Sequence, residues 1–264
     1  MSQTFDEEDE RLVRVSLRAR TAGLLRAGVR RFGDTIIPPV CVACHAPLSV
    51  HHALCAACWV NVEFIRPPLC DRLGIPLGYD TGATTVSARA MADPPDYDRA
   101  RGVAAFGGTM QKLIHDLKYA DRQDGRQLFG RWMVSAGAPL LADCQVIIPL
   151  PLNRWRLLHR RFNQSAVLAM EVSRLTGLPV APLALVRTRR TRQQVGLSME
   201  ERRVNVAKAF VVPERRKAEI AGRRVLLIDD VITTGATVNS AARALKDGGA
   251  RAVDVLALAI VTRG

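Results

Sequence analysis

Two adjacent acidic residues end an apolar run near the C-terminus, and small hydroxyl residues follow them. The segment is RRVLLIDDVITTGATVNSAARAL, and its polar centre comprises Asp229, Asp230, Thr233, Thr234, Gly235, Ala236 and Thr237. Neighbouring carboxylates repel each other and lose hydration when they are buried. A partner that compensates for both costs is therefore expected at this position.

The turn after the two acids is suited to binding a phosphate group. The run VLLI is continuously apolar, which is typical of a strand buried on both faces. TTGAT leads directly into a helical stretch, so its N–H groups and hydroxyls converge at a helix N-terminus, and Gly235 permits a close approach of the backbone. An acid after a strand binds ribose hydroxyls in dinucleotide-binding folds. The pattern favours a sugar phosphate, with ring hydroxyls or a metal carried by the ligand on the carboxylates.

Three alternatives to a sugar-phosphate site fit the acid pair less well. A receiver domain places its acids early, but only 34 residues follow Asp230 here. A phosphatase with an Asp nucleophile usually separates its two acids by one residue. A helix cap needs only one Asp or Thr and not the whole run.

Four cysteines nearer the N-terminus have the spacing of a metal site. They form two C-x2-C pairs separated by ten residues: Cys41, Cys44, Cys55 and Cys58. Two such pairs complete a tetrahedral thiolate site for zinc. Disulfides are disfavoured because no signal peptide is recognised, and a redox C-x-x-C normally occurs alone. A structural Zn²⁺ is predicted, with no open position for catalysis.

Further residues near the four cysteines leave alternatives open. His45, His51 and His52 could replace a cysteine as ligands, although exposed loop histidines are the simpler interpretation. Cys70 begins what resembles a second knuckle, but Leu73 stands where its partner cysteine would be. The second knuckle is therefore predicted to be degenerate.

The elements that must position these residues alternate along the chain from about residue 100. Predicted strands cover 102–106, 144–152, 179–188, 209–212, 223–230 and 252–262, and predicted helices cover 109–119, 127–141, 163–177 and 237–246. This alternation predicts an α/β fold, a mostly parallel sheet with helices on both faces. Ligands of such sheets bind beyond the carboxyl ends of the strands. An amphipathic helix is predicted over 10–32, and packing on the protein itself is favoured over a membrane or partner contact.

Composition limits the possible classes of protein. The chain has 264 residues and a net charge of +13, with arginines concentrated at 154–161, 187–203 and 215–224. This charge suggests anionic partners such as phosphate esters, pyrophosphate or nucleic acid, although a generally basic surface accounts for it equally well. No uncharged apolar run of eighteen residues and no basic, apolar leader are found, so a cytoplasmic protein without a transmembrane segment is expected.

The motifs together resemble the ComF family, in which a cysteine ribbon precedes a type I phosphoribosyltransferase-like domain. The similar segments include PPVCVACHAPL, IHDLKYADRQDGRQLFG, IPLPLNRWRLLHRRFNQSAVLA, RTRRTRQQVGLSMEERRVNVAKAF and the acid–threonine run. The resemblance spans residues 38–262 and implies a zinc ribbon over 38–80, with its second knuckle degenerate, and a phosphoribosyltransferase-like domain over 98–264. The amphipathic helix predicted from the spacing of apolar residues would form a separate N-terminal segment, 1–37. Arg161 stands where the family usually has a glycine before Phe162.

The resemblance also implies roles for individual residues. Asp229 and Asp230 would contact the ribose hydroxyls of phosphoribosyl pyrophosphate (PRPP), and residues 233–237 would hold its 5′-phosphate. Lys118 would contribute to the anion pocket, and Arg189 and Arg192 lie in the segment that would close over the site. Mg²⁺ would accompany PRPP.

Three functions are compatible with these expectations. The first is a Mg²⁺-dependent phosphoribosyltransferase with an unidentified acceptor base, and the second is a non-catalytic sensor of PRPP or a nucleotide. The third, implied by the family resemblance, is a factor in natural transformation and DNA uptake that handles single-stranded DNA or contacts DNA-processing proteins. Few aromatic residues interleave the arginines in the sequence, which argues against a stacking surface for DNA there.

Overall fold

The computed structural model describes residues 38–79, 82, 85–118, 125–152, 162–188 and 209–262. The predicted helix over 10–32, Arg189 and Arg192 lie outside these residues.

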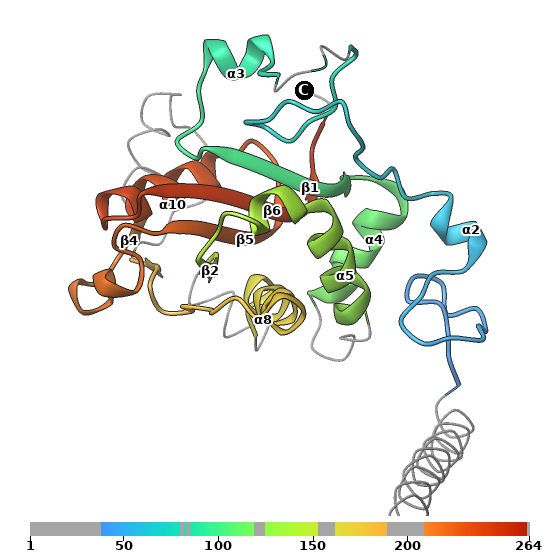
Figure 1. Cartoon of the computed structure of the whole chain (residues 1–264). Helices are drawn as coiled ribbons and strands as arrows, with labels where there is room; N and C mark the ends of the chain where they lie inside the picture. The colour runs from blue at the N-terminus through green and yellow to red at the C-terminus, as the bar shows by residue number, and fades with distance from the viewer. Residues whose placement is uncertain are drawn as a thin grey trace, which may run out of the picture.

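A parallel sheet of four strands forms the centre of the described structure (Figure 1). The strands are β1 (Arg99–Ala105), β2 (Val146–Pro149), β5 (Arg224–Ile232) and β6 (Ala252–Ile260), in the order β1-β6-β5-β2. Every residue of β6 is buried, as expected of a central strand covered on both faces. The four carboxyl ends therefore share one edge of the sheet, where a ligand would bind.

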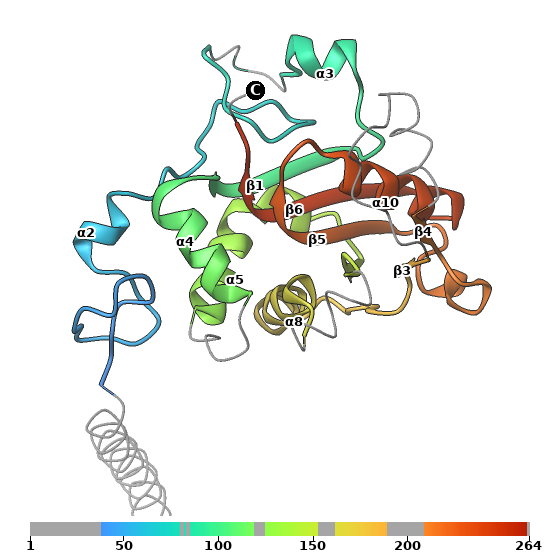
Figure 2. The same ribbon diagram turned by 180° about the vertical axis from the view of Figure 1, so that it is seen from behind.

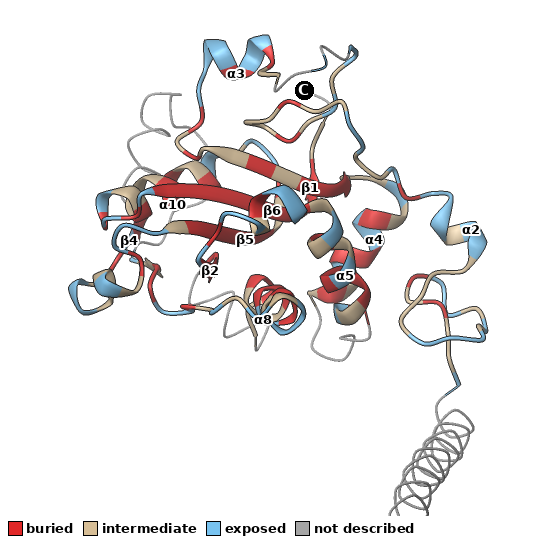
Figure 3. Ribbon diagram, in the orientation of Figure 1, coloured by how far each residue is buried: buried red, intermediate tan, exposed pale blue. Residues whose placement is uncertain are grey.

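Helices cover both faces of this sheet (Figures 1 and 2). One face packs against α4 (Gly108–Leu117), α5 (Arg126–Ala136) and α8 (Gln164–Thr176), and the other against α10 (Ala236–Asp247). Alternating residues of β5 divide between the two cores: Leu226 and Ile228 join the first, and Val225 and Leu227 join the second. Figure 3 shows buried residues concentrated along the strands and the inward faces of these helices.

Smaller elements surround this core. They are the helices α2 (Ala56–Trp59), α3 (Ala88–Ala92) and α6 (Ala138–Leu141), the short antiparallel pair β3 (Val186–Arg187) and β4 (Phe210–Val211), and the 3-10 helix η1 (Glu214–Glu219). Among the described residues, no helix is long and apolar enough to cross a membrane.

The structure confirms the predicted alternation of strands and helices, and α8 ends as predicted at Gly177, whose φ is 76°. Two predicted elements were wrong in detail. The helix predicted over 127–141 is interrupted at Gly137, and Pro139 lies in the first turn of the short helix α6 that follows. The strand predicted over 179–188 contributes only the two residues of β3, together with a single bridge from Val180 to Ile147.

A buried carboxylate ties three strands together at the sheet end that lies opposite the acid pair. Asp254 on β6 is 0% exposed. Arg99 on β1 contacts its Oδ2 atom at 2.6 Å, and Arg224 on β5 contacts the same atom at 3.1 Å. Because two guanidinium groups neutralise it, this carboxylate can be buried as an ion.

Asp254→Ala is expected to lower the free energy of unfolding by about 3 to 5 kcal/mol, because the change removes the buried carboxylate that two charged arginines share. Chemical denaturation measures this loss. Asp143→Ala is the matched control, since Asp143 also contacts Arg99 at 2.9 Å but its side chain is 52% exposed. The control should lose less than about 1 kcal/mol. Equal losses in the two variants would contradict this assignment.

Candidate functional site

Asp229 and Asp230 lie in the last part of β5, near the carboxyl edge of the sheet. Asp229 is 7% exposed and faces α8, where the Ser165 hydroxyl donates a hydrogen bond to its Oδ1 atom at 3.2 Å. The N–H group of Asp230 donates to the same Oδ1 atom at 2.8 Å. Asp230 is partly exposed, and its own Oδ1 atom accepts the Val231 N–H group at 2.9 Å. One carboxylate is thus buried and the other is accessible.

The electrostatics of this pair are unfavourable without a ligand. Burial raises the pKa of Asp229 well above its usual value, and the negative charge of Asp230 raises it further. Two hydrogen bonds, from the Asp230 N–H group and the Ser165 hydroxyl, only partly offset these effects. A ligand that brings hydroxyl donors or a cation to the pair would remove part of this cost.

The turn after β5 has the geometry expected for an anion site. Gly235 adopts a left-handed conformation with φ of 80°, which residues with a Cβ atom rarely adopt, and α10 begins at the next residue. The Thr234 hydroxyl accepts the Ala236 N–H group at 3.4 Å. Thr233, Thr234, Ala236 and Thr237 are exposed. Since the first N–H groups of a helix lack intrahelical partners, the start of α10 offers donors to an anion.

The N-terminus of α8 contributes residues that the sequence analysis did not select as site residues. Asn163 caps this helix by accepting the Ser165 N–H group at 3.1 Å, and its side-chain amide donates to the Leu150 carbonyl at 3.0 Å. Gln164 is buried, and its Oε1 atom has no hydrogen-bond partner among the described residues. Its Nε2 atom lies 3.5 Å from the carbonyl oxygen of Lys118, which places the backbone of that predicted residue beside α8. The sequence signal that could have identified this helix N-terminus is Asn163, a residue type that commonly caps helices, directly before the helical stretch.

The four cysteines of the first zinc-ribbon unit, within residues 38–59, lie together in one cluster. The Sγ atoms of Cys41, Cys44, Cys55 and Cys58 all lie within 4.8 Å of one another. A tetrahedral site with Zn–S bonds of about 2.3 Å separates its sulfur atoms by about 3.8 Å, and the Cys44 and Cys55 Sγ atoms lie 3.6 Å apart. The set therefore fits a structural Zn²⁺ with four thiolate ligands.

The backbone around this cluster favours a thiolate at Cys41. Burial raises the pKa of Cys41, but N–H donors including that of Cys55, at 3.3 Å from the Sγ atom, lower it to about 6. Zinc binds the deprotonated thiol, so these donors prepare the ligand.

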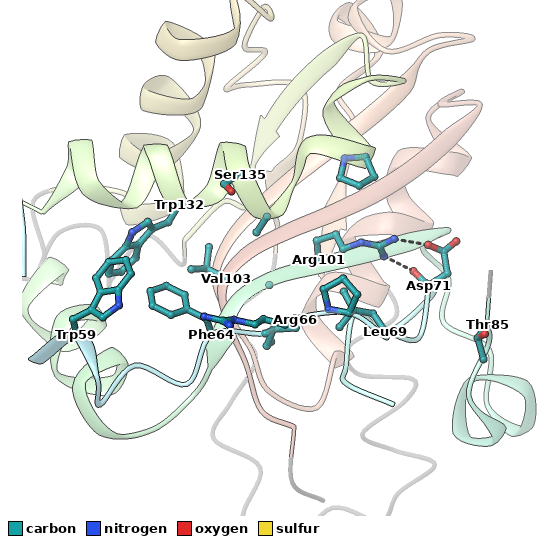
Figure 4. A pocket seen from close by; sticks show the side chains of 15 residues that line it. Trp59, Phe64, Arg66, Leu69, Asp71, Thr85, Arg101, Val103, Trp132 and Ser135 are labelled. Atoms are coloured by element: carbon teal, nitrogen blue, oxygen red, sulfur yellow. Dashed lines mark hydrogen bonds and ion pairs between the residues drawn. The ribbon is translucent and has the colours of Figure 1, made fainter. Parts of the chain in front are cut away.

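A cavity of about 660 Å³ lies beside β1, away from the acid pair (Figure 4). At one end Trp59 and Phe64 of the ribbon region meet Trp132 of α5, and at the other Arg101 contacts Asp71. The ring centroids are 4.9 Å apart for Trp59 and Phe64 and 5.2 Å apart for Phe64 and Trp132. Trp59 and Phe64 are close in sequence, but Trp132 belongs to a different element, and no local sequence pattern predicts that it joins them.

Comparison with known proteins gives two domain matches. A double zinc ribbon domain matches residues 32–89, and a phosphoribosyl transferase domain matches residues 163–263. Together with the parallel sheet and the cysteine cluster, these matches define an α/β phosphoribosyltransferase-like domain with an N-terminal zinc-ribbon module.

Proteins that are similar to this chain over most of its length identify the family more closely. DNA utilization protein YhgH from Escherichia coli (strain K12) is 32% identical over 232 residues, which cover 84% of this chain and 97% of that protein. Competence protein F from Haemophilus influenzae is 29% identical, with 83% and 96% covered. Competence protein ComFC from Bacillus subtilis is 25% identical, with 80% and 72% covered. The chain belongs to the ComF family, as its motifs suggested.

Proposed function

We propose that this protein binds PRPP with Mg²⁺ at the carboxyl edge of the sheet and acts as a phosphoribosyltransferase. One observation supports the proposal most. Burial and mutual repulsion make the carboxylate pair Asp229 and Asp230 electrostatically unfavourable, and the exposed turn that leads into α10 begins three residues after Asp230. A ribose 5-phosphate combines hydroxyl donors, which suit the carboxylates, with an anion, which suits the turn and the start of α10. In this proposal, residues 98–264 form the ligand-binding domain.

In this proposal, different residues of the site would bind different parts of PRPP. The N–H groups and hydroxyls of residues 233–237 would hold the 5′-phosphate, and the carboxylates of Asp229 and Asp230 would accept hydrogen bonds from the ribose hydroxyls. Lys118, Arg189 and Arg192 would provide positive charge for the pyrophosphate group, and the two arginines belong to a segment outside the described residues.

The proposed reaction is a substitution at the anomeric carbon of PRPP. A ring nitrogen of the acceptor base forms a bond to C1′ while the bond from C1′ to the pyrophosphate oxygen breaks, and pyrophosphate leaves with the electron pair. The base loses a proton to solvent. Carboxylates and phosphate oxygens are the ligands that Mg²⁺ prefers, and the bound ion would neutralise charge on the departing pyrophosphate.

A screen of acceptor bases tests this activity. Pyrophosphate release is measured with PRPP, Mg²⁺ and each base in turn, and a reaction without base is the control. We expect release that depends on one base and on Mg²⁺. Saturable PRPP binding without release for any base would instead support the sensing function. No PRPP binding at millimolar concentration would contradict both functions.

The aromatic cavity favours a second candidate function, the binding of single-stranded DNA. Two of the matched relatives carry the names DNA utilization protein and competence protein. Trp59 is 47% exposed beside Phe64 and Trp132, and Arg66 is exposed on the same cavity wall. Single-stranded nucleic acids bind surfaces that combine stacking aromatic rings with cationic side chains. This cavity thus groups aromatic residues, which are few in the arginine-rich segments.

Trp59→Ala is expected to weaken the binding of an oligo(dT) probe about 5- to 150-fold, because stacking of one base contributes about 1 to 3 kcal/mol. Fluorescence anisotropy at low salt measures the affinity, and zinc content confirms that the ribbon is intact. Tyr79→Ala is the control, since Tyr79 is also exposed but does not line the cavity. No binding by the wild type, or equal weakening in both variants, would rule out this surface.

A further inference from the structure

The ribbon region contains two units with the same backbone pattern, although only the first has four cysteines. Four backbone hydrogen bonds of the first unit each have an equivalent in the second. In the first unit they join Cys41 N–H to Ala46 O (2.8 Å), His45 N–H to Cys41 O (2.9 Å), Leu48 N–H to Pro39 O (2.9 Å) and Val42 N–H to Ala53 O (3.0 Å). In the second unit, in the same order, they join Cys70 N–H to Ile75 O (2.9 Å), Gly74 N–H to Cys70 O (2.8 Å), Leu77 N–H to Pro68 O (2.9 Å) and Asp71 N–H to Thr85 O (2.9 Å). Residues 39–59 and the described residues of 68–92 are therefore structural repeats.

Isolated bridges and short helices extend the equivalence. Val40 pairs with Pro47 as Leu69 pairs with Pro76, both antiparallel, and Cys41 pairs with Ala53 as Cys70 pairs with Thr85, both parallel. Each unit ends in a short helix, α2 after Cys55 and α3 after Ser87, and both capping residues are extended. The helix caps thus correspond, at 14 residues from Cys41 to Cys55 and 17 residues from Cys70 to Ser87.

This correspondence identifies the ligand positions of the second unit. The positions of Cys41, Cys44, Cys55 and Cys58 are occupied there by Cys70, Leu73, Ser87 and Ala90. Cys70 occupies the place of Cys41 in detail, since both are 0% exposed and both Sγ atoms accept an N–H hydrogen bond at 3.3 Å, from Cys55 and from Ser87. One thiolate and one hydroxyl do not make a zinc site.

Direct contacts connect the ligand positions of the second unit. The Ser87 hydroxyl donates to Cys70 Sγ at 3.2 Å and accepts the Ala90 N–H group at 3.3 Å. Ala90 is buried, and Leu73 packs against the core on the α10 face of the sheet. Hydrogen bonds thus join three of the four positions, and the fourth carries an apolar side chain that packs on the core.

The second unit is also held by strand β1. Arg101 contacts the Asp71 carboxylate at 2.5 Å and donates to the Asp71 carbonyl at 2.9 Å. Arg72 donates to the Tyr97 carbonyl at 3.2 Å. Gly74 has φ of 67°, and a Cβ atom there would lie 2.6 Å from the Ala100 carbonyl oxygen, so the knuckle lies directly against the strand.

We propose that residues 68–92 are a zinc ribbon that folds without metal, stabilised by the Ser87–Cys70 contact and by packing on β1. The matched domain is described as a double zinc ribbon, but in the described part of this chain the ligand atoms of a four-residue metal site gather only in the first unit. The second unit keeps the ribbon fold and packs against strand β1 as a structural part of the protein.

Zinc content tests this proposal. We expect one zinc per chain in the purified wild type, no change in Cys70→Ser, and loss of zinc in Cys44→Ser. The triple variant Leu73→Cys, Ser87→Cys and Ala90→Cys restores the four ligand positions and should bind two zinc ions per chain. Two zinc ions in the wild type, or a folded triple variant that binds only one, would overturn the proposal.

Hydrogen exchange provides a second test if the triple variant does not fold. After zinc is removed from the wild type with a chelator, amides in 39–59 should lose protection, whereas amides in 68–92 should keep it. Simultaneous loss of protection in both units would show that the second unit also depends on metal, and would overturn the proposal.

Discussion

The double substitution Asp229→Asn and Asp230→Asn is expected to abolish PRPP binding and, in the same protein, to raise the free energy of unfolding at pH 7. Binding is lost because the amides cannot replace two anionic acceptors for the ribose hydroxyls and the accompanying Mg²⁺. Stability rises because a buried carboxylate next to a second negative charge is replaced by a neutral group of the same shape. We expect a gain of about 1 to 3 kcal/mol, comparable to the cost of burying a poorly compensated polar group.

The pH dependence gives this stability gain a distinct signature. Since the pKa of Asp229 is raised in the folded protein, the folded state holds its proton at pH values where the unfolded state has lost it. The free energy of unfolding of the wild type should therefore fall as pH rises above the usual aspartate value of 3.8 toward the folded pKa. The double variant should lack this fall, so the difference between the two proteins should increase with pH.

Calorimetry with PRPP and denaturation between pH 4 and 8 measure the two effects. Asp247→Asn is the matched control, because Asp247 is an exposed acid at the end of α10, and it should change stability by less than about 0.5 kcal/mol. A double variant that binds PRPP like the wild type would refute the proposed site. A variant less stable than the wild type at pH 7 would refute the electrostatic cause of the gain.

Removal of zinc is expected to unfold the first ribbon while the parallel sheet stays folded. Within residues 38–59 only Cys41 and Ala43 are fully buried, so this segment has little apolar core of its own. In zinc-finger peptides, structural zinc contributes about 10 to 16 kcal/mol of binding free energy, which such a segment cannot replace. Cys41 and Ala43 do join the core on the α4, α5 and α8 face of the sheet, but nearly all the other buried residues of the two cores come from the strands and helices of the sheet domain, so we expect the sheet to stay folded without the metal.

Limited proteolysis after chelation measures this loss. Cleavage within 38–59 should become rapid in the zinc-free wild type and in Cys44→Ser, whereas far-ultraviolet circular dichroism should change little. Cys144→Ser is the control, since Cys144 is a buried cysteine just after α6 and outside the cluster, and it should retain zinc. A zinc-free protein that resists proteolysis at 38–59 would contradict the structural role of the metal.

Local motifs made the fold and the metal cluster predictable from the sequence. The acid–threonine run, the C-x2-C pairs and Gly177 after α8 each contain their information within a few residues. The apolar run VLLI predicted a buried strand correctly, because continuous hydrophobicity is the direct consequence of burial on both faces. The strand predicted over 179–188 was wrong because a comparable apolar composition occurs in a segment that packs irregularly against the sheet.

Features that depend on distant contacts could not be predicted in this way. Asp254 is the third residue of the otherwise apolar strand β6, and only the register of β1, β5 and β6 brings Arg99 and Arg224 to it. Ser165 reaches Asp229 across 64 positions of sequence. In the second ribbon unit only Cys70 indicated a degenerate knuckle, because the other three ligand positions carry no cysteine. The equivalence of the whole unit to the first is visible only in its backbone hydrogen bonds.

A crystal structure of the zinc-loaded protein with PRPP and Mg²⁺ tests the central claim most directly. We expect the 5′-phosphate against the N–H groups at the start of α10 and the ribose hydroxyls within hydrogen-bond distance of Asp229 and Asp230. PRPP bound elsewhere in the molecule, or no ligand at this edge of the sheet at saturating concentration, would contradict the claim.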